Sequence, residues 1–396
     1  MDSKTLTAVK FNCYASDAQL YVNKPSAIPE GVYKDLYAHE NKLDPWEPVS
    51  GESFEKWKQE RKEAWKSLAI EHGNVKPDGI EIPVVAQIPI NGNTFMPFDC
   101  RSINEELNKE GIFYIMDCVV PGKTEFLLAN IDKQYKVMDK DVFILGNEEL
   151  VRSAFLSSSI SGYYSSKFGL IYVRKRSIED NCYILMSYVK QPSRFVLDEK
   201  EREFIAEALH ANDIDCKMPF KDVARKVAPV VEKRAEGVVR HEVGHLKHMQ
   251  DNNFESERIL TNLSASHSDI KTINFMKALE DALADTHPEG RLRYYTSQKD
   301  KGSLYLVSLD MGIGLKEDSD RNQVLLFQSK LLNEYVPTFL KFTKNEDWVA
   351  MEKAIEKDYA SNLKVAQTIL EIEKMDRDPE YKLSIIKKNM IPALLK

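Results

Sequence analysis

The sequence predicts an α+β protein with a β-rich N-terminal half and a mainly helical C-terminal half. Two patterns support this prediction. Between residues 79 and 189, short apolar runs are separated by turn-forming residues, which is typical of strands. After Pro192, apolar residues recur at helical spacing in several long segments. We therefore expect a mixed, β-rich region over residues 1–195 and a mainly helical region over residues 196–396.

The bulk composition is that of an ordinary soluble globular protein. The 396 residues are 43% hydrophobic and 30% charged, with a formal net charge of -7. This acidic balance gives no general attraction to nucleic acid or to anionic membranes, and no apolar run is long enough to predict a membrane span. The five scattered cysteines form no CxxC pair, and the N-terminus lacks an apolar signal core. We expect a cytoplasmic protein with reduced thiols, although export by a non-classical secretion route would fit the same composition.

The N-terminal half is expected to contain one helix, several short strands and a hairpin. Residues 51–72 carry an intermittent apolar stripe among charged side chains, which indicates an amphipathic helix. Asn-Gly and Pro-Gly pairs then separate the strand-like runs. The expected strands are residues 80–90, 111–119, 125–131 and 141–145, followed by a hairpin formed by residues 168–174 and 182–189.

The C-terminal half is expected to be built from long helices and one strand. The strand is expected at residues 303–309, and Pro229 is expected to start a new helix or to kink one. The expected helices are residues 197–211, 219–251, 270–285, 322–344 and 348–396.

The most informative motif is the pentapeptide His-Glu-Val-Gly-His, which lies inside the predicted helix at residues 219–251. On a helix, His241 and His245 stand one turn apart on the same face. Two imidazoles at that spacing can bind a tetrahedral zinc ion at about 2.0–2.1 Å. Glu242 stands beside the first histidine, where its carboxylate can reach a water molecule rather than the metal. The motif therefore combines a Lewis acid, a water of lowered pKa and a base.

The residues flanking the motif are mostly uncharged, as expected for a helix beneath an active-site floor. In this respect residues 238–248 resemble the extended signature of zinc metallopeptidases of the zincin group. Lys247 departs from that signature, because a hydrophobic residue is usual there. The resemblance implies a zincin-like HExxH helix in the catalytic region, one Zn²⁺ per chain, and a peptide or protein substrate.

A catalytic zinc ion needs a third protein ligand. Residues 279–285 resemble the second motif of the glutamate zincins, most closely that of the dipeptidyl peptidase III group. By this resemblance Asp281 takes the position of the ligand and Asp285 that of the acid that orients the first histidine, although Asp in place of Glu shortens the reach by one methylene. Glu280 is an alternative ligand, because it lies nearer the apolar face of the helix.

The tetrahedral intermediate of peptide hydrolysis needs a hydrogen-bond donor in addition to the metal. Zincins often use a downstream histidine or tyrosine for this purpose. The resemblance therefore makes His287 and Tyr295 candidate catalytic residues. The other donors in the same segment are Arg291, Arg293 and Tyr294.

A different class of protein, a helical non-haem di-iron protein, is the first alternative. Di-iron bundles use two Glu-x-x-His pairs, and the sequence contains such pairs at Glu207/His210 and at Glu242/His245. This alternative leaves His241 without a role and places a β-rich half outside the bundle.

A second alternative is a non-catalytic binding protein in which four protein ligands close a structural metal site. The fourth ligand would be His248 or His267. His248, however, stands roughly 10 Å along the helix axis from His241, which places it beyond easy reach of the same ion. The oligomeric state is not indicated by any pattern in the sequence.

Overall fold

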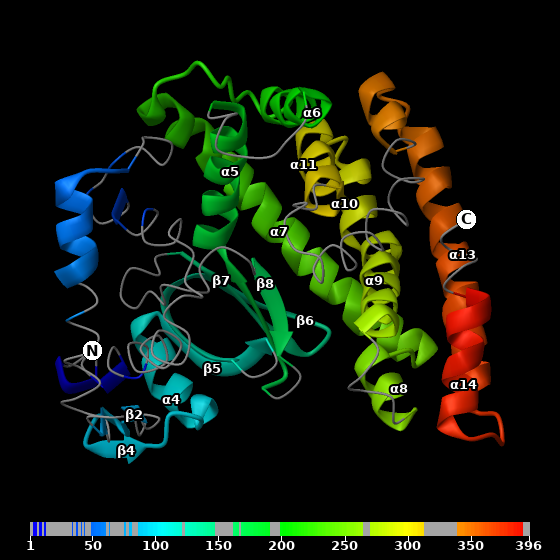
Figure 1. Cartoon of the computed structure of the whole chain (residues 1–396), viewed down its shortest axis with the longest axis horizontal. Coiled ribbons are helices and arrows are strands. Elements are labelled where there is room, and N and C mark those ends of the chain that lie inside the picture. The colour runs from blue at the N-terminus through cyan, green and yellow to red at the C-terminus, as the bar shows by residue number, and fades with distance from the viewer. Residues whose placement is uncertain are drawn as a thin grey trace. The chain divides into compact units, whose positions relative to one another are not determined.

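The computed structural model describes residues 49–60, 86–120, 123–146, 161–165, 168–190, 199–263, 270–312 and 339–390, together with isolated positions before residue 86. The chain forms two compact units, Met1–Ser187 and Tyr188–Lys396, which are described separately below. The first contains a curled β-sheet and the second is mainly helical, which confirms the predicted α+β class (Figure 1). Among the described helices, none has the length and apolar character needed to span a bilayer.

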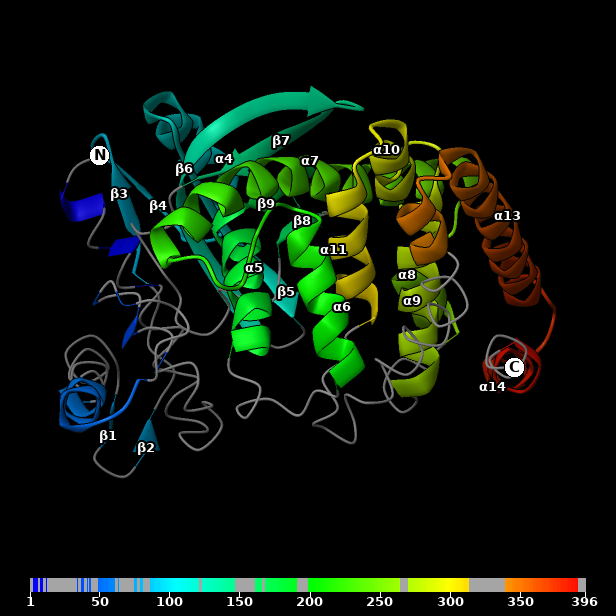
Figure 2. The ribbon, with the colours of Figure 1, turned by 90° about the horizontal axis from the view of Figure 1, so that it is seen from above.

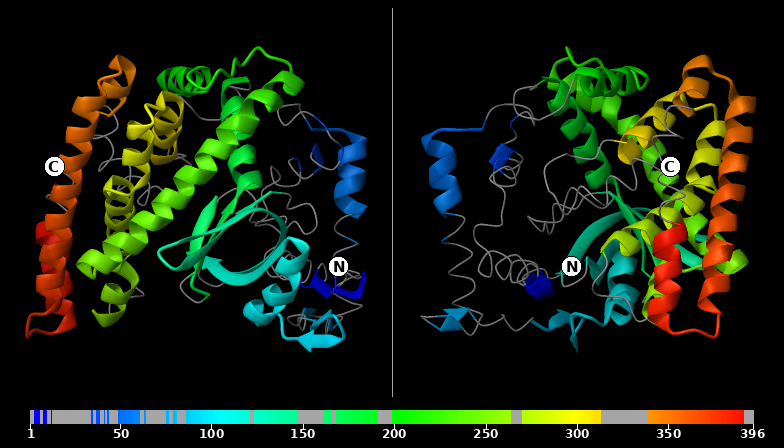
Figure 3. Two further views of the ribbon diagram at one scale, coloured as in Figure 1. Left: turned by 180° about the vertical axis from the view of Figure 1, so that it is seen from behind. Right: turned by 45° about the vertical axis from the view of Figure 1, so that its right-hand side comes forward.

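A five-stranded sheet is the centre of the first unit. All neighbouring strands are antiparallel except β7 and β9, which are parallel. The register shifts within the β5–β6 and β6–β7 pairs, and such irregularities increase the twist and bend of a sheet. Figure 3 shows the resulting curl. In spatial order the strands are β5 (Ile112–Val120), β6 (Lys123–Val137), β7 (Lys140–Leu145), β9 (Leu170–Arg174) and β8 (Gly162–Ser165).

Helix α4 (Cys100–Leu107) packs against the edge strand β5. The Asn104 side chain donates to the backbone carbonyl of Tyr114 at 2.6 Å and accepts from its backbone N–H at 2.8 Å. These bonds satisfy backbone groups that an edge strand would otherwise leave unpaired. Phe113, Leu128 and Tyr172 belong to the apolar core beneath the helix.

The remaining elements at the N-terminal end of the first unit are short. A helix is described at residues 52–60, within the predicted helix at residues 51–72. Strands β3 and β4 join through Asn91 and Gly92, whose φ angles of 51° and 81° suit a tight hairpin turn. The strands are β1 (Val75–Lys76), β2 (Gly79–Ile80), β3 (Ile88–Ile90) and β4 (Asn93–Phe95).

The predicted hairpin of residues 168–174 and 182–189 is wrong in its second half. Strand β9 is followed directly by helix α5 (Lys175–Lys190). Ile178, Cys182 and Met186 are fully buried at a spacing of four residues, so the segment has one apolar helical face. The aromatic and branched residues of the segment favour a strand locally, but tertiary packing overrides that preference.

The second unit is a set of packed helices. Helix α7 packs against α9 and α10, and α13 packs on the other side of α9 (Figure 1). Helices α6 and α11 lie side by side (Figure 2). The helices are α6 (Glu199–His210), α7 (Phe220–Asn252), α8 (Ser256–Asn262), α9 (Ile270–Thr286), α10 (Arg291–Ser297), α11 (Lys301–Gly312), α13 (Trp348–Glu373) and α14 (Pro379–Ile385), with a helical stretch at residues 339–345 and a π-helical turn at Ile386–Met390.

Helix α7 is one uninterrupted element of 33 residues. It continues through Pro229, so this proline does not start a new helix. It ends at Asn253, whose left-handed backbone (φ 53°) forms the C-cap. The motif His-Glu-Val-Gly-His therefore lies in the C-terminal half of a long, continuous helix.

Two further expectations for the C-terminal half need correction. Residues 303–309, expected as a strand, belong to α11. They are buried on all sides, and a fully buried helix shows no periodicity that distinguishes it from a buried strand. The expected helix at residues 348–396 is divided into α13 and α14, because Asp378 caps a new helix by accepting from the backbone N–H of Tyr381 at 2.8 Å. Residues 322–338 lie outside the described part of the chain.

Candidate metal centre

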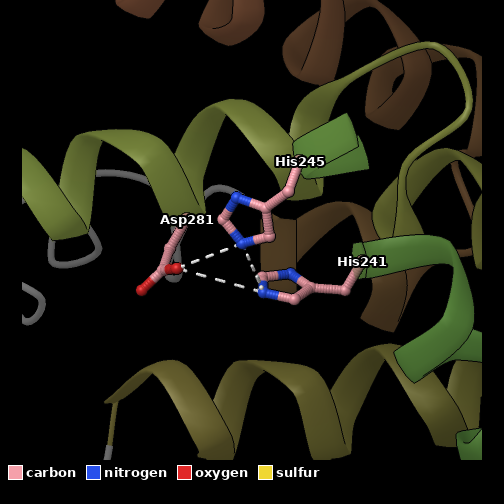
Figure 4. Close-up of side chains that lie close together, drawn as sticks. All are labelled: His241, His245 and Asp281. Carbon is pink, nitrogen blue, oxygen red and sulfur yellow. Dashed lines mark hydrogen bonds and ion pairs between the residues drawn. The ribbon is translucent and has the colours of Figure 1, made fainter. Parts of the chain in front are cut away.

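Helix α7 presents His241 and His245 one turn apart, as their spacing predicts. Their Nε2 atoms lie 3.1 Å apart, and the two rings meet edge to face (Figure 4). Both side chains are about one-fifth exposed, so the pair lies at a surface rather than in the core. The two nitrogens converge on one point.

Asp281 of helix α9 completes this group of donors. Its Oδ1 lies 3.4 Å from His245 Nε2 and 3.9 Å from His241 Nε2 (Figure 4). A tetrahedral zinc ion with ligands at about 2.0–2.1 Å holds them about 3.3 Å apart, and the three separations of 3.1, 3.4 and 3.9 Å lie around this value. Within the described residues, these three side chains form the only group with such spacing. This geometry agrees with the resemblance, which gives Asp281 the position of the third ligand.

A close approach of α9 to α7 places Asp281 beside the histidines. Gly244 lies against the backbone carbonyl of Ala284, and a Cβ at Gly244 would stand 2.1 Å from that oxygen. Gly290, which precedes α10, contacts the same carbonyl, and a Cβ there would stand 2.2 Å from it. Neither position can carry a side chain without moving the helices. The glycine inside the motif therefore sets the distance between the helices that carry the donors.

Two of the three donors, His245 and Asp281, have shifted pKa values. Burial opposes a charge on His245, but the hydrogen bond with Asp281 and the negative charges of Glu242, Asp281 and Glu280 outweigh it and raise the pKa of His245 to about 9. Burial also opposes the charge on Asp281, yet its hydrogen bond with His245 and the two imidazoles lower the pKa of this carboxyl group. The surroundings of His245 therefore favour positive charge at the point where the three donors meet.

Asp285 lies one helical turn beyond Asp281 and accepts a hydrogen bond from Nδ1 of His241 at 2.6 Å. Burial opposes ionisation of this carboxyl group, but Arg291 and His241 hold its pKa well below the usual range. An ionised carboxylate can only accept, so His241 carries its proton on Nδ1 and directs the lone pair of Nε2 toward the donor cluster. This is the orienting role that the resemblance implied for Asp285.

The two remaining acids have different positions. Glu242 is buried, and its charge acts on His245. Glu280 is turned toward α8, where both the backbone N–H and the hydroxyl of Ser256 donate to its carboxylate. Burial raises the pKa of Glu280. Glu280 is thus engaged by Ser256 and is absent from the donor group found among the described residues, which favours Asp281 as the third ligand.

The two candidate oxyanion stabilisers are engaged away from the donor cluster. The Tyr295 hydroxyl donates to the backbone carbonyl of Lys233 at 3.2 Å, about two turns before His241 on α7. His287 accepts from the backbone N–H of Glu289 through Nδ1, and its Nε2 lies 3.6 Å from a carboxylate oxygen of Asp251. These contacts indicate structural roles for both residues, and the geometry does not support their predicted catalytic role.

The other donors of the same segment are also occupied. Arg293 pairs with Glu352 and Glu356 of α13, and the ring of Tyr294 is covered by the guanidinium of Arg240 at 5.3 Å. Arg291 forms a bidentate ion pair with Asp285. No spacing rule in the sequence predicts that pairing, because it depends on the turn that joins α9 to α10.

The alternative ligand sets are not assembled in the described residues. Glu207 and His210 are exposed, and Glu207 pairs with Lys344 at 2.7 Å, so the second Glu-x-x-His pair of a di-iron site is missing from the cluster. His248 is fully buried and accepts from the side-chain amide of Asn252 at 3.2 Å. Burial lowers the pKa of His248 to about 4. His267 lies outside the described residues.

Three residues contribute to the site without having been predicted from the sequence. Gly244 and Ala284 set the approach of the two helices, and Ser256 holds Glu280 away from the histidines. The only signal for the first was a glycine in the interior of a long helix, which indicates a close contact because glycine disfavours helices.

Comparison with known proteins gives a match for one part of the chain. Residues 4–162 match the N-terminal domain of a family of unknown function (DUF6866). The matched segment ends before the first residue of the donor cluster. No curated protein and no solved structure matches the chain.

Proposed function

We propose that the chain is a zinc-dependent hydrolase, most directly a metallopeptidase that cleaves peptide or amide bonds. The observation that carries this proposal is the group His241, His245 and Asp281, whose donor atoms are 3.1–3.9 Å apart. Three ligands, two of them imidazoles, leave one of four tetrahedral positions for water, as in catalytic rather than structural zinc sites. The Asp281 side chain is 45% exposed, so solvent reaches the donor group.

Each residue of the proposed site would have a distinct role in the reaction. When bound, zinc supplies a Lewis acid that lowers the pKa of water and polarises a carbonyl group. Glu242 follows His241 directly and would take the proton of the attacking water, then deliver it to the leaving nitrogen. His241 is oriented by Asp285, and His245 by the helix that both histidines share. The peptide class of substrate rests on the resemblance to zincins.

The first test is the metal content of the full-length protein, measured by elemental mass spectrometry beside His241→Ala. We expect about one zinc ion per chain, lost in the variant. A single iron ion would indicate instead the oxidative chemistry of two-histidine, one-carboxylate sites. Two irons would support the di-iron alternative. Absence of any metal after zinc has been supplied would overturn the proposal.

The second test separates catalysis from metal binding. Glu242→Gln should abolish cleavage of a peptide library and leave the zinc content unchanged, because Glu242 acts on water and not on the metal. Glu236→Gln, on the same helix, is the matched control and should retain activity, since Glu236 pairs with Arg240. Loss of zinc in Glu242→Gln would contradict the role assigned to Glu242.

We also propose that the protein acts in the cytosol. No disulfide joins the described cysteines Cys100, Cys182 and Cys216, which fits a reducing compartment. Alkylation of cells before lysis should label Cys216 in the native protein; its recovery as a disulfide would argue for an oxidising compartment.

A further inference from the structure

We propose that Arg291 is a positioning residue for the metal site: it fixes the Asp285 carboxylate, which in turn fixes the ring of His241. This inference rests on the proposed function for its purpose, because the ring so fixed belongs to a metal ligand. Its geometry is independent of any substrate. Arg291 and Asp285 touch directly, and the side chain of Asp285 touches His241.

The hydrogen bonds form a connected chain from α10 to α7. Arg291 Nε donates to Asp285 Oδ1 at 2.9 Å, and a terminal nitrogen donates to Oδ2 at 2.7 Å. The same Oδ1 accepts from Nδ1 of His241 at 2.6 Å. A planar guanidinium that binds both oxygens fixes the plane of the carboxylate as well as its position. Arg291 therefore determines the orientation of the His241 ring through Asp285, without contacting the proposed metal position itself.

The ion pair between Arg291 and Asp285 is buried, which restricts its geometry. The Asp285 side chain is only 2% exposed and that of Arg291 is 13% exposed. Water cannot readily replace the guanidinium at a carboxylate so enclosed, and an unpaired charge there would be costly. By contrast, Arg293 on the same helix pairs with two carboxylates on the surface. Arg293 is therefore a matched control that lies close in sequence.

The local backbone explains how Arg291 reaches Asp285. The chain turns between the two residues, with the backbone N–H of Gly290 donating to the carbonyl of His287 at 2.8 Å. Gly290 then lies against the Ala284 carbonyl, and Arg291 is the first residue of α10. The close approach at Gly290 brings the start of α10 next to the last turn of α9. The turn thus serves to hold Arg291 beside Asp285.

The first measurement uses metal-free, full-length protein. The Nδ1 proton of His241 should give a downfield proton NMR signal, because it is held in a short hydrogen bond to a carboxylate. We expect this signal to be lost or shifted in Arg291→Met and to be unchanged in Arg293→Met. Arg291→Lys should give an intermediate result, since lysine keeps the charge but cannot bind both oxygens.

The second measurement is zinc affinity, obtained by competition with a chromogenic chelator. Partners of ligating histidines typically change metal affinity 10–100-fold when removed, so we expect Arg291→Met to weaken binding about 10-fold. Asp285→Asn should weaken it as much or more. In the Asp285→Asn background, Arg291→Met should have little additional effect, because Arg291 acts through Asp285. This double variant also removes the uncompensated buried charge, so it remains informative if Arg291→Met alone does not fold.

The outcomes distinguish this inference from the proposed function. If the wild type binds no zinc, the proposed function fails, but a changed His241 signal in Arg291→Met still supports positioning. If the wild type binds zinc and Arg291→Met leaves both the signal and the affinity unchanged, the positioning role is overturned while the metal site stands. Fully additive effects of the two substitutions on zinc affinity would also overturn it, because they would show that Arg291 acts independently of Asp285.

Discussion

The backbone carbonyl of Ala284 contacts Gly244 so closely that the first carbon of any side chain would stand 2.1 Å from the oxygen. This contact joins the helix of the two histidines to the helix of the two aspartates. It is made between backbones, so neither side can relieve crowding by changing a rotamer. The spacing of the donor cluster therefore depends on the absence of a side chain at one position.

Gly244→Ala is expected to lower stability and zinc affinity together. Alanine favours a helix over glycine, but overpacking against a fixed carbonyl costs about 1–3 kcal/mol and moves Asp281 relative to the histidines. Urea denaturation of the metal-free protein and chelator competition measure the two effects. Gly237→Ala is the control: its added carbon meets the side chain of Tyr295, away from the donors, so stability should fall while zinc affinity stays close to wild type. Unchanged zinc affinity in Gly244→Ala would argue against the spacing role.

The choice between two neighbouring acids can be tested directly. Asp281→Asn should weaken zinc binding by more than about 100-fold, beyond the range typical of residues that only support a ligand. Glu280→Gln should leave the affinity nearly unchanged, because Glu280 is bound to Ser256 and glutamine can accept the same hydrogen bonds. Chelator competition on the two variants measures both effects. The opposite ranking would make Glu280 the ligand.

Zinc binding should release a proton over much of the neutral range. The pKa of His245 is raised to about 9, so below that pH the metal-free side chain is protonated and zinc must displace the proton. The apparent affinity should therefore rise about tenfold per pH unit through the neutral range and level off as the pH passes the pKa of His245. A pH indicator dye in weakly buffered solution measures the release. Zinc binding with no proton release at pH 7.5 would contradict the raised pKa.

Tyr295→Phe should affect stability and not catalysis. The hydroxyl donates to the carbonyl of Lys233, and loss of one such hydrogen bond costs about 1 kcal/mol. Urea denaturation measures this change. Once a peptide substrate has been found, kcat should be close to that of the wild type. A fall in kcat of about 100-fold or more would restore the oxyanion role first predicted for Tyr295.

The parts of the site that could be predicted from the sequence are those that depend on a single helix. The histidine pair needs only the helical repeat, whereas the role of Asp285, on a second helix, was implied by the resemblance of residues 279–285 to the second motif of the glutamate zincins. The choice between Glu280 and Asp281 depends on tertiary contacts of α9, namely its close approach to Gly244 and the hydrogen bonds between Ser256 and Glu280. The sequence offers Arg291 only as one of several candidate oxyanion donors, because its bond to Asp285 depends on the turn between α9 and α10.

The same distinction applies to the fold. Strands β5 and β7 lie within one residue of their predicted bounds, and β6 was predicted only in its first half, because turn residues mark the ends of the apolar runs but β6 continues beyond residue 131. The segments at residues 182–189 and 303–309 were mistaken for strands because short apolar runs, rich in branched and aromatic residues, fit both structures. Their helical state becomes evident only when the surrounding core is present.

The difference in exposure across the donor cluster has a consequence for metal exchange. The Asp281 side chain is 45% exposed and the Asp285 side chain only 2% exposed, so one side of the cluster is accessible to solvent and the other is buried. A chelator can approach from the Asp281 side, while Asp285, which orients His241, stays buried. Removal and return of the proposed zinc ion should then be fast and reversible without unfolding. Loading would follow the supply of free metal in the surroundings and would not depend on refolding of the chain.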